Sequence, residues 1–336
     1  MNKYTYSFKE ISNVVVFGGG DLAVFTINLL LQKQIEVGVV TSKRHAQDIV
    51  SHDGKKIAFL EYLKEIQIPY DVVKDLDSQS EWQKWISERT FSFSISAEWI
   101  FRQKNIFFLN KRLVNIHTSL LPDMKGGGGL SWNTMMQKNE TGTTIHFVDQ
   151  GVDTGDIILQ EKIIFPDEIV LLNDKTAYAF TMHCKLLESF WGRLLHKKEF
   201  LCSKQDLKSG SYWPRLSTDT HGYIDWKWSS RNIVDFIRAF SHPHSGAKTF
   251  VSEKTVRLYE AELVDDGEVF HPFQIGLVYR IDNISLWVAT VDFSLMITDY
   301  EVGSSDRCRK VSLGDRFYTP QYILDEAMRT RIYYKP

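Results

Sequence analysis

Two polar side chains on one predicted strand have the types and the spacing for acid–base chemistry. They are Asn115 and His117, in the run Asn-Ile-His-Thr-Ser-Leu-Leu-Pro at residues 115–122. Residues two apart on a strand point to the same face, so we expect the amide and the imidazole to lie side by side. An amide N–H can stabilise an oxyanion, and an imidazole can accept a proton. A single Asn-x-His is more often structural, so the pair alone leaves both interpretations open.

An aspartate in a glycine-flanked loop is a candidate partner for the imidazole. Asp153 lies in the run Gly-Val-Asp-Thr-Gly-Asp at residues 151–156, after an alternating strand at 144–148. Acids between glycines can be plain turn residues. Beside His117, the carboxylate would instead orient the ring and stabilise its protonated form. Four further glycines at 126–129 permit either close backbone approach to a ligand or a mobile loop.

A glycine-rich turn near the start of the chain could bind a phosphate. Residues 18–23, Gly-Gly-Gly-Asp-Leu-Ala, fit the G-x-G-x-x-A fingerprint of dinucleotide sites and follow an apolar run. The acid expected after the second strand is absent, and Thr-Ser-Lys-Arg stands there at 41–44, which would suit a phosphorylated ribose. The motif alone leaves open an NADP-dependent oxidoreductase and a plain strand-to-helix turn.

Strands and helices alternate through the first half of the sequence. Residues 14–17 form a continuous apolar run that predicts a buried strand. Further strands are predicted at 36–40, 70–74, 91–95 and 112–117, with 70–74 at a sheet edge. Amphipathic spacing predicts helices at 22–32, 60–66, 78–89 and 173–195, the first capped by Asp21. We therefore expect an α/β fold whose first domain, residues 1–205, is built on a mostly parallel sheet.

The composition changes after this region and predicts a second, smaller domain. Residues 203–219 are rich in Ser, Lys, Asp and Gly and are interpreted as a linker. A helix is predicted at 230–239, followed by strands at 248–251, 255–263, 275–281 and 286–300. We expect residues 206–336 to hold this linker and a small antiparallel β-barrel.

Charge and cysteine content exclude several classes of protein. The chain of 336 residues has 40 Lys and Arg against 42 Asp and Glu, which argues against a large nucleic-acid surface. Its three cysteines are dispersed, so neither a disulfide framework nor a zinc cluster is expected, and no metal is predicted. No apolar window is long enough for a membrane span, and no signal peptide is evident, which favours a cytoplasmic protein.

Taken together, these motifs resemble one family. Residues 96–165 resemble the core of the folate-dependent formyltransferases, whose hallmark is Asn-x-His, then Ser-Leu-Leu-Pro, then Asp in an Asp-x-Gly loop. Those residues stand here as Asn115, His117, residues 119–122 and Asp153. Segments at 222–226 and 237–247 resemble the linker and the start of the C-terminal domain found in methionyl-tRNA and sugar N-formyltransferases. The resemblance implies a Rossmann-like first domain and an OB-like barrel in the second. In this family the glycine turn belongs to a Rossmann-like loop that borders the acceptor, and not to an NAD site.

The resemblance implies roles for the three polar residues. N10-formyltetrahydrofolate would be the formyl donor and an amine the acceptor. Asn115 would donate a hydrogen bond to the oxyanion, and His117 would take the proton of the amine. Asp153 would hold His117 in the required tautomer.

The resemblance also implies two sets of binding residues. The folate pterin would lie between two short segments, with contacts at Trp99, Ile100, Phe101, Val148, Gln150, Gly151 and Val152. The acceptor would lie near Gly19, Lys125, Gly127 and Trp132, where Lys125 is a candidate for a pyrophosphate and Trp132 for stacking on a base or sugar. Each of these residues has a plain structural alternative.

The favoured acceptor is a nucleotide-linked amino sugar, UDP- or dTDP-linked, used in surface polysaccharide synthesis. The near-neutral charge suits a small acceptor. Methionyl-tRNA formylation is the first alternative, because the two-domain length fits it, although only short basic pairs are present. An NADP-dependent oxidoreductase is the second. The resemblance also allows a homodimer.

Overall fold

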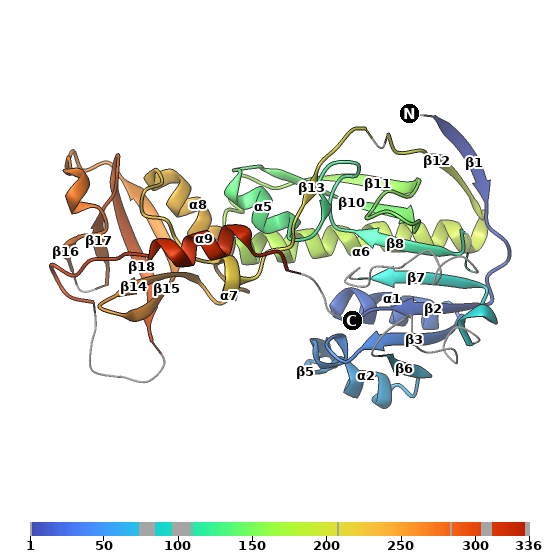
Figure 1. Cartoon of the computed structure of the whole chain (residues 1–336). Helices are drawn as coiled ribbons and strands as arrows, with labels where there is room; N and C mark the ends of the chain where they lie inside the picture. Colours follow the sequence, from blue (N-terminus) through green and yellow to red (C-terminus); the bar gives the residue numbers. More distant parts are fainter. Residues whose placement is uncertain are drawn as a thin grey trace.

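The computed structural model describes residues 2–73, 85–95, 109, 111–206, 208–282, 284–303 and 311–332. A sheet of nine strands runs through the first part of the chain, and Figure 1 shows how its strands are arranged. Its strand order is β1-β12-β11-β10-β8-β7-β2-β3-β6. The parallel half consists of β2 (Asn13–Phe17), β3 (Glu36–Ser42), β6 (Tyr70–Val73), β7 (Phe91–Ile95) and β8 (Leu113–His117). The antiparallel half consists of β1 (Lys3–Ser7), β10 (Glu140–Phe147), β11 (Ile157–Ile164) and β12 (Glu199–Ser203).

This arrangement confirms the expected α/β class and the edge position of β6. The central strands β7 and β8 are buried along their whole length, as expected for apolar strands covered on both faces. Alternate residues of β2 enter different cores, Val14 and Val16 on one face and Val15 and Phe17 on the other. Helices complete the layers: α1 (Asp21–Gln32), α2 (Phe59–Glu65), α5 (Gly129–Met135) and α6 (Leu172–His196).

The glycine turn between β2 and α1 is fixed by the neighbouring strand. Gly18 has φ 118°, and a Cβ there would lie 1.9 Å from the carbonyl oxygen of Ile95 at the end of β7. Gly20, with φ 80°, is the N-cap, so the expectation that Asp21 caps α1 is wrong. Asp21 is instead the first helical residue, and its carboxylate accepts the N–H of Ser51 at 2.9 Å. Ser51 belongs to a short hairpin of β4 (Ile49–His52) and β5 (Lys55–Ala58).

The second part is an antiparallel sheet of five strands in the order β14-β15-β18-β17-β16. The strands are β14 (Ala247–Val251), β15 (Lys254–Val264), β16 (Val278–Ile281), β17 (Leu286–Ala289) and β18 (Ser294–Val302). The segment 314–318 bonds to β16 through Val278 and to β14 through Phe250, so it links the two edge strands. The sheet is thereby closed, which agrees with the expected OB-like barrel.

One expected strand of the barrel is in fact two. Residues 286–300 contain a turn at 290–293 that separates β17 from β18. The turn lacks glycine and proline and is held by tertiary contacts. Asp292 accepts the N–H and the hydroxyl of Ser230, at 2.9 and 2.6 Å, at the start of α8 (Ser230–Phe240). Such a turn has no local signal, because its partner lies far away in the sequence.

The expected linker at 203–219 is docked along part of its length. β13 (Tyr212–Trp213) pairs in parallel with β9 (Lys125–Gly126), and α7 (Thr218–His221) follows. The two parts also meet where Gln137 donates to the carboxylate of Asp235 in α8 at 2.7 Å. Figure 1 shows α9 (Gln321–Arg329), drawn in red, running from the barrel toward the first part. In the described ranges, none of the helices has the length and apolar composition that crossing a bilayer requires.

Candidate active site

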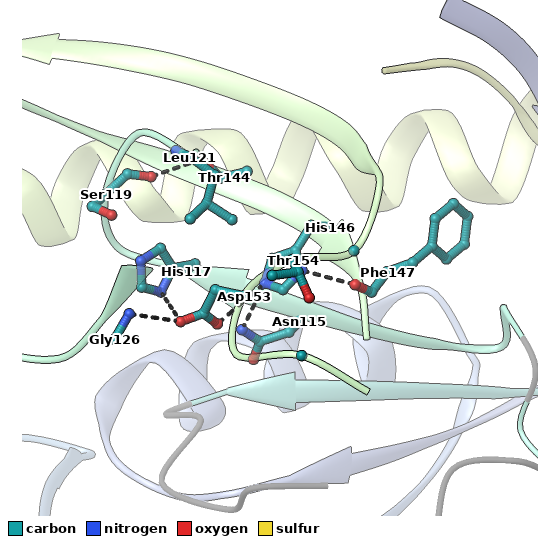
Figure 2. Close-up of polar contacts among 12 residues, drawn as sticks. Asn115, His117, Ser119, Leu121, Gly126, Thr144, His146, Phe147, Asp153 and Thr154 are labelled. Atoms are coloured by element: carbon teal, nitrogen blue, oxygen red, sulfur yellow. Dashed lines mark hydrogen bonds and ion pairs between the residues drawn. The ribbon is translucent and has the colours of Figure 1, made fainter. Parts of the chain in front are cut away.

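Four polar residues of the site lie on facing positions of two paired strands. In the antiparallel pair β8 and β10, Asn115 lies opposite His146, and His117 lies opposite Thr144. Directly opposite residues share one face of a sheet, so all four side chains project to the same side. Figure 2 shows Asn115, His117 and His146 converging on Asp153. Asn115 and His146 are each only 2% exposed, which places their polar atoms in a poorly solvated region.

Asp153 enters from the turn between β10 and β11. Its Oδ2 lies 3.7 Å from Nδ1 of His117, and its Oδ1 lies 3.6 Å from Nε2 of His146. The same Oδ2 accepts the N–H of Gly126 at 2.9 Å. Its φ of 54° is in the left-handed region, which a non-glycine residue adopts at some cost in free energy. The surrounding contacts therefore hold the carboxylate between two imidazoles.

The hydrogen bonds assign a role to each ring nitrogen. Nδ1 of His146 donates to the carbonyl of Phe147 at 2.8 Å, so Nε2 accepts from the amide of Asn115 at 3.2 Å. Burial lowers the pKa of His146, which keeps this ring neutral at neutral pH. Nε2 of His117 donates to the carbonyl of Met124 at 3.0 Å. Nδ1 of His117 therefore carries the lone pair and faces Asp153.

The loop after β8 is fastened to β10 by side-chain hydrogen bonds. The hydroxyl of Thr144 donates to the carbonyl of Ser119 at 2.7 Å and accepts the N–H of Leu121 at 3.2 Å. The loop of Asp153 is held from the other side, where Gln205 donates to the carbonyls of Asp153 and Gly155 at 3.0 and 2.6 Å. These bonds fix the site before a ligand binds, which lowers the cost of reorganisation.

These side chains open into a cavity of about 500 Å³. Of the residues implied by the sequence, its lining includes Asn115, His117, Asp153, Val148, Gly151, Val152, Gly19 and Gly127. Trp99, Ile100 and Phe101 lie outside the described residues.

Three other expected binding residues are not part of the lining: Gln150, Lys125 and Trp132. Two of them hold the linker instead. Nζ of Lys125 donates to the carbonyl of Ser209 at 3.4 Å, and the indole of Trp132 donates to the carbonyl of Pro214 at 2.8 Å.

The lining also includes residues that the sequence analysis did not select. Tyr212 and Arg215 come from the linker, and Arg331 and Ile332 from the segment after α9. None of them carries a local motif. Among the described residues, no group of three or more His, Cys, Asp or Glu side chains converges as a metal-binding set.

Comparisons with known proteins identify the family of the chain. Models of the families "Formyl transferase" and "Formyl transferase, C-terminal domain" match residues 12–178 and 217–312. A curated relative is the methionyl-tRNA formyltransferase of Ruminiclostridium cellulolyticum, 29% identical over 200 residues, or 58% of this chain and 61% of the relative. The chain thus spans less than two thirds of the length of the first curated relatives that it matches.

Two solved structures have a similar fold. One is WlaRD, a sugar 3N-formyl transferase solved with dTDP and 5-N-formyl-THF, with a TM-score of 0.63 and 20% identity over 86% of this chain and 98% of that one. The other is an N-formyltransferase from Helicobacter canadensis in complex with folinic acid and dTDP-3-aminofucose. Its TM-score is 0.63, with 19% identity over 86% of this chain and 99% of that one.

Proposed function

The chain belongs to the formyl transferase family, and on that premise we propose that it transfers a formyl group from N10-formyltetrahydrofolate to the amine of a nucleotide-linked amino sugar. The observation that carries the proposal is the juxtaposition of Asn115, His117 and Asp153 in one cavity. A cytoplasmic location and a role in surface polysaccharide synthesis belong to the same proposal.

Each of the three side chains has a different role in the proposed acyl transfer. Attack of a neutral amine on the formyl carbon places a negative charge on the formyl oxygen. The amide nitrogen of Asn115 uses one N–H for His146, and the second N–H of the same group stabilises that oxygen. Nδ1 of His117 takes the proton of the attacking amine, and the carboxylate of Asp153 stabilises the imidazolium that results. The proton then passes to the departing folate nitrogen.

The cavity fits the folate donor at its Val148–Val152 side. Apolar Val148 and Val152 line it beside the main chain of Gly151, which suits a flat heteroaromatic ring with polar edges. We propose these residues for the pterin, together with Gln150 and the Trp99–Phe101 segment. Gly19 and Gly127 border the acceptor in this proposal. Lys125 and Trp132 would act through the loop that they fasten to the linker.

Two observations bear on the acceptor. The near-neutral charge of the chain, 40 basic against 42 acidic residues, suits a small molecule better than tRNA. The names of the curated relatives favour the alternative, methionyl-tRNA formylation, which the same assay tests. An NADP-dependent oxidoreductase receives less support. The reason is that the segment after β3 packs on the glycine turn that would hold the dinucleotide. A Cβ on Gly19 would lie 2.9 Å from Cβ of His45.

The test is a formyl-transfer assay read by mass spectrometry. The protein is mixed with N10-formyltetrahydrofolate and a panel of UDP- and dTDP-linked amino sugars, and in a parallel arm with initiator methionyl-tRNA. We expect a formyl mass gain on one sugar and none with His117→Ala. Formylation of methionyl-tRNA alone would replace the proposed acceptor, and no transfer to any amine would contradict the proposal as a whole.

A further inference from the structure

The segment that follows α9 returns from the barrel to the catalytic cavity. Arg331 and Ile332 line the cavity, although in the sequence they follow the whole five-stranded sheet. The guanidinium of Arg331 donates to the hydroxyl of Tyr212 at 3.0 Å and lies 5.2 Å from the centre of its ring. One residue earlier, the carbonyl of Thr330 contacts Nε2 of His221 at 2.9 Å. The segment is therefore anchored twice beside the linker.

A second arginine lines the same cavity from the linker. The Cβ of Arg215 would lie 3.0 Å from a Cβ on Gly127, so the arginine backbone follows the glycine loop closely. Burial and, to a lesser degree, the neighbouring Arg44 lower the pKa of Arg215 to about 10, while Asp48 opposes the shift. The side chain therefore stays charged at neutral pH, in surroundings that disfavour a cation. A bound anion would relieve that cost.

Arg215 lies at the glycine-turn side of the cavity. The groups whose charges affect its pKa, Arg44 and Asp48, follow β3. Asp48 reaches the turn, because a Cβ on Gly19 would lie 3.4 Å from its Oδ2. Gly19 and Gly20 are themselves part of the lining. The arginine is thus close to the turn that borders the acceptor in the proposed function.

The acidic side chains of the lining already accept hydrogen bonds from the protein. Asp21 accepts from Ser51, and Asp153 accepts from Gly126. Asp149 accepts the N–H of Gly151 at 3.0 Å. These bonds orient the three carboxylates toward protein donors, and the two guanidinium groups of the described lining are those of Arg215 and Arg331.

We propose that Arg215 and Arg331 together bind the diphosphate of the nucleotide-linked acceptor, so that the linker and the segment after α9 both contribute to the acceptor site. This inference rests on the proposed function and adds the residues that recognise the nucleotide. Arginine suits the task, because its planar fork donates two parallel hydrogen bonds to phosphate oxygens. The diphosphate role thereby moves from Lys125, whose Nζ contacts Ser209, to two residues far from it in sequence.

The test is calorimetric binding to the full chain, without turnover. The probes are dTDP, UDP, the corresponding nucleosides and folinic acid. Arg215→Gln and Arg331→Gln are compared with Arg329→Gln, a matched control on α9 whose Nε donates to the carbonyl of Asp325. We expect each cavity variant to bind its nucleoside diphosphate roughly 10- to 100-fold more weakly, the usual range for a charge-assisted hydrogen bond. Nucleoside and folinic acid affinities should be unchanged, as should all affinities of Arg329→Gln.

The outcomes separate this inference from the proposed function. If the parent protein binds a nucleoside diphosphate and both cavity variants bind it equally well, the role of the two arginines is wrong while the acceptor class stands. If the variants lose folinic acid instead, the arginines serve the carboxylates of the donor and the inference is overturned. If the parent binds neither dTDP nor UDP, the acceptor class itself fails. Melting temperatures of the variants show whether each remains folded.

Discussion

Oδ2 of Asp153 lies 3.7 Å from Nδ1 of His117 and accepts the N–H of Gly126 at 2.9 Å. The backbone amide thus fixes the carboxylate at a point where it faces the lone pair of the imidazole. A proton taken up by Nδ1 of His117 therefore lies next to the carboxylate of Asp153, whose negative charge stabilises the imidazolium, as a general base requires. This contact requires three segments to be placed correctly relative to one another. They are the turn after β10, the glycine loop at 126–129 and the end of β8.

Replacing the carboxylate by an amide tests that arrangement. We expect Asp153→Asn to lower kcat by a factor within the roughly 100- to 10,000-fold range of acid–base catalysis, because the imidazolium loses its counter-charge. The KM for the folate donor should change little. The exposed Asp167, which accepts a hydrogen bond from Asn139 outside the cavity, provides the control variant Asp167→Asn. Steady-state kinetics decide, and an unchanged kcat would contradict the role of Asp153.

Removal of the other two polar groups should abolish most of the turnover. Asn115→Ala removes the proposed oxyanion donor and is expected to cost about 100- to 1,000-fold in kcat. His117→Ala removes the proposed base and should cost at least as much. Each variant should keep its far-ultraviolet circular dichroism. His196→Ala, at the exposed end of α6, is the control. Near-native turnover by His117→Ala would rule out the mechanism.

His146 is a positioning residue in this mechanism, since it acts through Asn115. His146→Leu removes the acceptor of the Asn115 amide, and we expect kcat to fall by up to about 100-fold, as for a small misplacement of a catalytic group. His146→Gln restores an acceptor and should recover part of the loss. Equal kcat values for the two variants would indicate that His146 only fills space in the core.

A buried histidine outside the site, His183, should account for part of the stability that the fold loses at acid pH. Burial lowers the pKa of His183 to about 4, whereas the unfolded chain binds this proton near 6.5. Between these values the unfolded state holds more protons, so the stability present above pH 6.5 is lost as pH falls toward 4. The loss from pH 7 to 5 is about 2 kcal/mol for this group. Urea unfolding should show a shallower pH dependence for His183→Gln than for the parent, and an identical slope would contradict the assignment.

Gly126 is required by the docking of the linker. A Cβ there would lie 2.3 Å from the carbonyl oxygen of Trp213 in β13, and its φ is 100°. We expect Gly126→Ala to lower the free energy of unfolding by about 1–3 kcal/mol and to reduce activity, because the N–H that holds Asp153 moves. Gly192→Ala is the matched control, since it lies in α6 with nothing within 4 Å of its added Cβ. That variant should be more stable by roughly 0.5–1 kcal/mol, as in any helix interior. Chemical denaturation measures the free energy of unfolding of both variants. A Gly126→Ala variant with unchanged stability and activity would show that β13 can shift to make room for the Cβ.

The sequence was sufficient where the signal is local. The apolar run of β2, the alternating Phe and Ser of β7 and the Asn115-x-His117 spacing of β8 depend only on neighbouring residues. Other parts depend on pairings between distant segments. His146 joins the site only through the antiparallel register that sets it opposite Asn115. Arg331 lines the cavity because the chain returns to the first part after α9, and no sequence pattern around Arg331 predicts that return.

The pairing of β1 with β12 has a consequence for how the chain acquires its shape. Lys3–Ser7 hydrogen-bonds along Glu199–Ser203, so the outer edge of the sheet joins the two most distant segments of the first part. Such a long-range closure is entropically costly and forms slowly. During synthesis, the N-terminal strand therefore has to wait until residue 203 has left the ribosome before it finds its partner. Until then its unpaired edge is open to pairing with other chains.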